Sequence, residues 1–259
     1  MLRAVNASRT TRWITTAAAA LALAGCGGGS SPPAGSGPVM ATETMAVRRE
    51  SPHFQVLAGQ APAAVVDAIA DRLEAERGRL LSDLRVTDVP QVRVRVWQDQ
   101  AAWNAEVVRY FGRSFTTGGY IAGPGEMRLL AVDRVAVNAT HEFAHIVSLH
   151  VNPGFANNPR GLWEATALYE NGELVDPRTL GYMTSGRPPT LQTLNSDISA
   201  NTQVYEVGYT LAEFVVATYG RDALLGLIRA NGDIAAVLGL TPAEFERDWY
   251  AFVRARHLS

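Results

Sequence analysis

The sequence predicts an α+β fold, in which a small N-terminal β-sheet with helices precedes a mostly helical C-terminal part. Three observations support this fold class. Before residue 131, several segments alternate apolar and polar residues, which is the period of a half-buried strand. After residue 135, apolar residues recur every three or four positions, which is the period of an amphipathic helix. Breaks rich in Gly, Pro and Asn separate these segments.

The N-terminal part of the predicted fold combines strands with helices. Val92-Arg93-Val94-Arg95-Val96-Trp97 has the clearest period of two, with one apolar face. The run Gly123-Pro124-Gly125-Glu126 is typical of a turn and predicts a hairpin between the segments on either side of it. The predicted strands are 53–57, 92–97, 118–122 and 127–131, and the predicted helices are 62–84 and 101–111.

The sequence of the C-terminal part predicts helices separated by turns. A helix over 135–150 ends at the turn Asn152-Pro153-Gly154, and a second helix follows the break Asn157-Asn158-Pro159. Residues 181–203 are rich in Ser, Thr, Asn, Gly and Pro and are predicted to form a long loop. The remaining predicted helices are 204–219 and one that starts at the capping box Thr241-Pro242-Ala243-Glu244.

The run His141-Glu142-Phe143-Ala144-His145 lies in the helix 135–150, and Glu164 follows it after eighteen intervening residues. Residues i and i+4 share one face of a helix, so the two histidines can bind one metal ion. Glu164, early in the next helix, is the predicted third ligand. Such a set leaves the fourth position of a zinc ion open for water, whose pKa zinc lowers to about 7. Because Glu142 can deprotonate that water, the sequence predicts a zinc hydrolase.

These residues resemble the gluzincin clan of metallopeptidases, which includes thermolysin and the M1-type aminopeptidases. The run from Leu162 to Tyr169 is similar to the L-x-E-G-x-A-x-Y helix of that clan, with Ala165 where glycine is usual. Leu168 stands where thermolysin-like enzymes carry an aspartate that orients a ligand, so that orienting group is missing here.

A second resemblance concerns a tyrosine. Tyr205-Glu206-Val207-Gly208-Tyr209 is similar to the Y-E-x-G segment of the M1-type enzymes, whose tyrosine stabilises the oxyanion. The resemblance implies this role for Tyr205, with Tyr209, one turn further along the helix, as the alternative.

The resemblance also implies an architecture, a thermolysin-like zincin core with the metal site between the sheet part and the helical part. In that layout an edge strand beside the metal-binding helix pairs with the backbone of an extended substrate. The candidate edge is 120–122 or 127–130, and the alternative is that both are ordinary strands of the sheet. The sequence lacks the long N-terminal domain and the exopeptidase motif of M1-type enzymes, so aminopeptidase specificity is not implied.

The N-terminus has the pattern of a targeting segment. Three arginines precede an apolar stretch of about a dozen residues, which is typical of a secretory signal peptide. Leu23-Ala24-Gly25-Cys26 resembles a bacterial lipobox, which implies that Cys26 is lipidated and anchors the protein to a membrane. Gly27 in place of aspartate favours the outer membrane, facing the periplasm, in a Gram-negative cell. We expect a signal peptide over 1–25, a flexible tether over 26–40 and a metallopeptidase domain over 41–259.

The composition narrows the choice of partners. The formal net charge is −2, and the arginines are scattered rather than gathered in a basic stripe, so we expect no nucleic-acid partner. Cys26 is the single cysteine, which leaves none for a disulfide. The hydrophobic core, helped by the metal, must therefore stabilise the fold.

Two functions from different classes fit the sequence. The first is a lipid-anchored zinc peptidase of the cell envelope that acts on a peptide or protein substrate. The second is a non-catalytic zinc-containing envelope lipoprotein that binds a protein partner. Glu142 favours the enzyme, because a general base is needed for hydrolysis but not for holding zinc.

Overall fold

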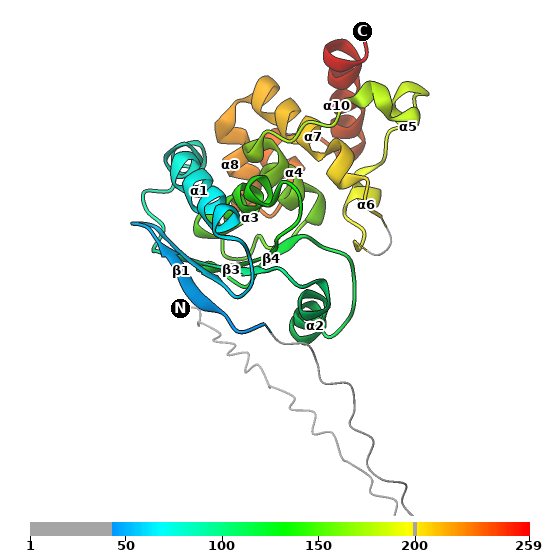
Figure 1. Ribbon diagram of the computed structural model, residues 1–259. Coiled ribbons are helices and arrows are strands. Elements are labelled where there is room, and N and C mark those ends of the chain that lie inside the picture. Colours follow the sequence, from blue (N-terminus) through cyan, green and yellow to red (C-terminus); the bar gives the residue numbers. More distant parts are fainter. Residues whose placement is uncertain (1–42, 199–200) are drawn as a thin grey trace, which may run out of the picture. The chain divides into compact units, whose positions relative to one another are not determined.

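The computed structural model describes residues 43–198 and 201–259, which fold around a five-stranded mixed sheet (Figure 1). The strands lie in the order β1-β2-β3-β5-β4. β2, β3 and β5 are parallel to one another, whereas β1 and β4 pair antiparallel to them at the two edges. The strands are β1 (Ala46–Glu50), β2 (Phe54–Ala58), β3 (Val92–Trp97), β4 (Gly119–Ile121) and β5 (Glu126–Leu130).

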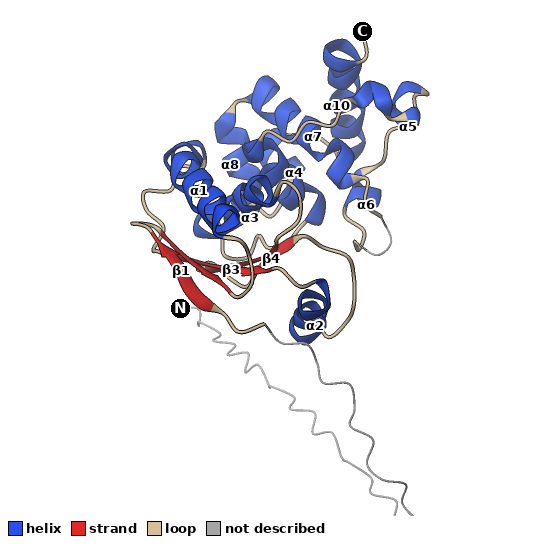
Figure 2. Ribbon diagram, in the orientation of Figure 1, coloured by secondary structure: helices blue, strands red, loops and turns tan. Residues whose placement is uncertain are grey.

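Helices cover both faces of this sheet, and the remaining helices build the C-terminal part (Figure 2). α1 and α3 lie on one face and α2 on the other. A short 3-10 turn, η1 (Pro177–Thr179), precedes the two four-residue helices α5 and α6. The α-helices are α1 (Ala63–Asp83), α2 (Gln100–Phe111), α3 (Val135–Val151), α4 (Arg160–Asn171), α5 (Gly181–Thr184), α6 (Leu191–Leu194), α7 (Val204–Tyr219), α8 (Arg221–Arg229), α9 (Ile234–Leu238) and α10 (Pro242–His257).

The two faces of the sheet pack into separate cores. On β3, Val92, Val94 and Val96 are at most 1% exposed and belong to the larger core, which also includes α1, α3 and the C-terminal helices. Successive side chains of a strand point to opposite faces, so Trp97 turns to the other side. There it packs with Trp103 of α2 in the smaller core. Apolar side chains on the two faces of β3 therefore enter the two different cores.

Helix α3 is the buried centre of the molecule. It packs against α1, α4 and the strands β4 and β5. Every residue from Ala139 to Leu149 is buried, including the polar ones. A helix that is covered on all sides must satisfy its polar side chains internally, so the polar residues of this stretch need partners within the protein or a bound ligand.

The predicted elements of the N-terminal part, the hairpin and the longer helices are confirmed with ends shifted by one or two residues. The prediction of a long loop over 181–203 is wrong, because α5 and α6 lie within it. Four-residue helices show no apolar period, and α6 depends on tertiary contacts. Its first residue, Leu191, donates its backbone N–H to Glu246 of α10 at 2.7 Å.

Four elements had no prediction, namely β1, η1, α8 and α9. β1 is an edge strand whose residues are mostly exposed on both faces, so its sequence does not alternate. The signal peptide, Cys26 and the tether predicted within residues 1–40 lie outside the described residues. Across 43–198 and 201–259, none of the helices combines the length and apolar character needed to cross a membrane.

Candidate metal centre

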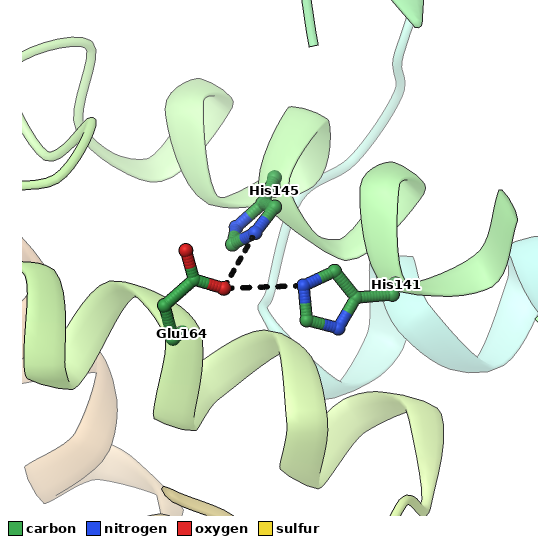
Figure 3. Close-up of side chains that lie close together, drawn as sticks. All are labelled: His141, His145 and Glu164. Carbon is green, nitrogen blue, oxygen red and sulfur yellow. Dashed lines mark hydrogen bonds and ion pairs between the residues drawn. The ribbon is translucent and has the colours of Figure 1, made fainter. Parts of the chain in front are cut away.

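Two helices bring the three predicted ligands together. His141 and His145 lie one turn apart on α3, and Glu164 lies in the second turn of α4. Both imidazoles point at the same carboxylate oxygen (Figure 3). Glu164 Oε2 is 3.3 Å from His141 Nε2 and 3.5 Å from His145 Nε2. All three side chains are at most 9% exposed.

This arrangement fits a tetrahedrally bound metal ion. Bonds of about 2.0–2.1 Å to a tetrahedral ion place neighbouring ligand atoms about 3.3–3.4 Å apart. The two N···O separations, 3.3 and 3.5 Å, match that spacing. One ligand atom from each of the three residues lies within 4.8 Å of the others. Two imidazole nitrogens and one carboxylate oxygen suit zinc and other first-row transition metals better than magnesium or calcium.

The electrostatics of the triad favour a cation between its members. Burial alone would raise the pKa of Glu164, but hydrogen bonds from His141 and His145 hold that pKa well below its usual range. Burial lowers the pKa of His145 to about 4, so His145 is neutral, which is the form that binds a metal. Burial acts in the same direction on His141, but Glu164 and Glu142 outweigh it and raise its pKa. The surroundings that favour a proton on His141 also favour a metal cation.

Glu142 lies between the triad and the edge strand β4. Its side chain is buried, and its Oε1 faces Gly119, where an added Cβ would come within 2.9 Å of that oxygen. Glycine at this position therefore leaves room for the carboxylate. Burial, together with the negative charge of Glu164, raises the pKa of Glu142 to about 8, although His141 acts in the opposite direction. A carboxyl group with a raised pKa can accept and return a proton near neutral pH.

The structure separates the two candidate tyrosines. Tyr205, in the first turn of α7, donates its hydroxyl to Glu164 Oε1 at 3.3 Å. Tyr209 instead packs against Tyr169, with ring centroids 5.3 Å apart, and does not line the cleft that holds the triad. Gly208 explains how Tyr205 reaches the site, since a Cβ there would come within 2.9 Å of Leu168 on α4. The missing side chain lets α7 approach α4 closely.

Trp163 holds the ring of His145 in place. The two rings are stacked 4.0 Å apart with an angle of 8° between their planes. His145 Nδ1 is buried and makes no hydrogen bond with any described residue, so the usual hydrogen-bonded orienter is missing. The stack with Trp163 therefore fixes the orientation of the imidazole.

Arg160 was missed by sequence reasoning. It is the first residue of α4 and is 7% exposed. Its Nη1 donates to the backbone carbonyls of Ser196 and Asn201 at 3.0 and 3.1 Å, and its guanidinium lies 5.4 Å from the centre of the Tyr205 ring. Arg160 thus ties the chain that leads into α7 to the helix of the third ligand. Its position one turn before Glu164 was the available signal.

One cleft contains all of these groups. It has a volume of about 1240 Å³, and its walls include the triad, Glu142, Tyr205 and Arg160. The three remaining histidines lie elsewhere. His53 pairs with Glu74 at 2.8 Å, His257 pairs with Glu213 at 2.7 Å, and His150 Nε2 contacts the backbone carbonyl of Pro124 at 3.3 Å. The candidate centre is therefore specific to the triad and not a general feature of the histidines.

No protein-family model matches this chain, and a comparison with curated proteins gives no significant match either. The case for a metal centre therefore depends on the geometry of the buried triad itself. That geometry shows a group of side chains able to hold a metal ion.

Proposed function

We propose that this protein is a zinc-dependent peptidase of the gluzincin type that hydrolyses peptide bonds in the cleft between β4 and α4. The observation that carries the proposal is the convergence of His141, His145 and Glu164, with Glu142 beside them and in the same cleft. A site that only held a structural metal would not need a second buried carboxylate next to the ligands.

Each side chain has a role in this proposal. Zinc, when bound, supplies Lewis acidity and lowers the pKa of a coordinated water to about 7. His141, His145 and Glu164 hold the ion, and the stack with Trp163 keeps His145 oriented. Glu142 accepts the proton of the attacking water and donates a proton to the leaving amine. Tyr205 donates a hydrogen bond to the oxygen of the scissile carbonyl as negative charge develops there.

The edge strand β4 supports a peptide as the substrate. β4 is the last strand of the sheet, whereas β5 lies inside it, so of the two candidate edges only β4 has a free side. α3 packs against β4. A chain added to β4 would pair through its backbone and pass close to Glu142, so extended peptides would bind mainly through main-chain hydrogen bonds.

We further propose that the peptidase is attached to the cell envelope through lipid on Cys26, with residues 26–40 as the tether. The lipobox resemblance supports this location. Replacing Cys26 by serine would move the protein from the membrane fraction to the soluble fraction, or leave an uncleaved precursor, and an unchanged distribution would contradict the anchor.

Substitution Glu142→Gln tests the proposed chemistry. The amide keeps the size of the side chain and lies outside the ligand set, so zinc content and melting temperature stay near those of the wild type. Peptide cleavage falls by about 10²- to 10⁴-fold, because positioned proton transfer is lost. Cleavage of a diverse peptide library by the zinc-loaded proteins gives the measurement.

The matched control is Glu206→Gln. Glu206 adjoins Tyr205 in sequence but bonds to the hydroxyl of Tyr182 and does not line the cleft. This variant keeps its activity. If the wild type and Glu142→Gln retain zinc, cleave nothing and bind the same envelope protein, the peptidase proposal fails and a non-catalytic binding protein is the better description.

A further inference from the structure

The cleft continues beyond the triad to a group of four aromatic residues. Tyr110 and Phe111 end α2, Phe115 lies in the following loop and Tyr120 is in the middle of β4, and all four line the same cleft as the triad. We call these four residues the aromatic shelf.

The rings of the shelf hold one another. Phe111 lies 4.8 Å from Tyr110, 4.9 Å from Phe115 and 4.8 Å from Tyr120, measured between ring centroids. The guanidinium of Arg128 lies 5.0 Å from the Tyr110 ring and 5.7 Å from the Tyr120 ring. Neighbouring rings and a stacked cation restrict side-chain motion, so little conformational entropy remains to be lost when a ligand binds.

Two members of the shelf are unusually exposed for aromatic side chains, whereas Tyr120 is only 7% exposed. Tyr110 is 42% and Phe111 is 40% exposed. Two further cleft residues, Leu174 and Val175, are 44% and 36% exposed. Eight large hydrophobic side chains among the described residues are exposed to this degree, and these four line the one cleft. Such a concentration of exposed apolar surface marks a binding site.

Two ion pairs lie on the walls of the cleft. Arg113 contacts Asp197 at 2.9 Å, and Arg134 contacts Glu173 at 2.8 Å. A charged side chain of a ligand would compete with these pairs, whereas an apolar side chain would leave them intact. The cleft therefore favours an uncharged, apolar ligand near the shelf.

From these contacts we infer that the aromatic shelf is a substrate subsite that binds an aromatic side chain of a peptide lying along β4. The inference rests on the proposed function of the cleft. On β4, Gly119 faces the carboxylate of Glu142, and the next residue, Tyr120, belongs to the shelf. A peptide beside this strand reaches the shelf within one or two residues of the proposed reacting bond, since a strand rises about 3.3 Å per residue.

Peptide binding to the full chain carrying Glu142→Gln tests the subsite without catalysis. The probes are labelled decapeptides of Ala, Gly and Ser in which one Phe is moved through every position, with matched peptides that carry Ala or Glu instead. At the best position, Phe binds about tenfold more tightly than Ala, and Glu binds no better than Ala. Fluorescence anisotropy gives the dissociation constants.

Substitutions in the shelf remove this preference. Adding Phe111→Ala reduces the ratio of Phe to Ala affinity to below about twofold. The control is Val108→Ala, since Val108 is also on α2 and 39% exposed but does not line the cleft. It keeps the tenfold ratio. Because Phe111 is exposed, the variant folds, and an unchanged melting temperature checks this.

The outcomes separate the subsite from the proposed function. Equal affinity for Phe and Ala at every position, no binding of any peptide, or equal effects of the two alanine substitutions would overturn the subsite. Preferential binding of Phe to a protein whose wild-type form cleaves no peptide would leave the subsite standing and remove the peptidase. Cleavage of peptides without any aromatic preference would support the peptidase and overturn the subsite.

Discussion

Helix α4 carries two buried carboxylates, and their surroundings differ. Glu170, near the end of the helix, contacts Arg79 of α1 at 3.2 Å and Arg221 of α8 at 2.5 Å, and its side chain is fully buried. Glu164, six residues earlier, faces the imidazoles of His141 and His145. Within the described residues, no arginine forms an ion pair with Glu164.

The difference distinguishes a structural carboxylate from a ligand. Glu170 receives its positive charge from the protein, and the two arginines tie α4 to α1 and α8. Glu164 has no arginine partner, and its imidazole partners can carry a proton or bind a metal ion. A buried carboxylate is costly without positive charge beside it, and a metal ion held by the same imidazoles would supply that charge.

Substitution Glu164→Gln gives the largest expected effect of this comparison. The amide oxygen is a far weaker ligand than a carboxylate, so bound zinc falls from about one per chain to less than about a tenth of that. Peptide cleavage falls by about 10³-fold or more. Metal analysis and kinetics on the purified variant measure both changes, and a variant that keeps its zinc would break the comparison.

Substitution Glu170→Gln is expected to lower stability and to leave zinc binding unchanged. It leaves two arginines without their carboxylate and lowers the free energy of unfolding by about 2–3 kcal/mol, towards the lower end for a buried pair because Arg79 and Arg221 are partly exposed. Zinc content per folded chain does not change. Denaturant unfolding of the zinc-loaded protein measures the loss, and a loss of zinc together with stability would contradict the distinction.

Substitution Tyr205→Phe tests the role of the hydroxyl group that contacts Glu164. The phenyl ring keeps its packing against Arg160 and loses only the hydroxyl that donates to Glu164. We expect a decrease in kcat of about 10²-fold with zinc retained. Tyr209→Phe is the matched control and leaves kcat unchanged. Similar kinetics for the two variants would remove Tyr205 from the reaction.

The smallest effect concerns a carboxylate of the Glu170 type, Glu126 of β5. Burial alone would raise its pKa, but the hydrogen bond from Arg128 and the ion pair with Arg95 lower it below its usual value. Because Glu126 is more acidic in the folded than in the unfolded chain, its stabilising contribution is present above about pH 4.5 and is lost as the pH falls. Glu126→Gln therefore costs about 1 kcal/mol at pH 7.

The difference between Glu126→Gln and the wild type should disappear as the pH approaches 3. Urea unfolding at a series of pH values tests this. A cost that is constant over the whole range would show that Glu126 contributes through packing and not through its charge.

The ligand set was open to prediction because its members depend on local spacing. Two histidines four residues apart share a helix face in any α-helix, and the break before α4 allows the chain to return Glu164 to them. The longer helices were predictable for the same reason, since their apolar period is local. The identity of β4 as the edge required the order of the strands, which depends on contacts between distant segments.

Other features depend on contacts between residues far apart in the sequence, so no local sequence pattern predicts them. Arg160 acts through the carbonyls of Ser196 and Asn201, which are more than thirty residues away in sequence. The aromatic shelf joins the end of α2 to β4 through tertiary contacts. α6 owes its start partly to Glu246 of α10. Partnerships of this kind become visible only when the chain is folded.

The central claim is that His141, His145 and Glu164 hold one metal ion. The most direct test is a crystal of the zinc-loaded protein, with anomalous scattering measured on both sides of the zinc absorption edge. We expect one strong peak about 2.0–2.1 Å from His141 Nε2, His145 Nε2 and a carboxylate oxygen of Glu164. The absence of a peak among these three side chains, or a peak only at another site such as His257 and Glu213, would contradict the account.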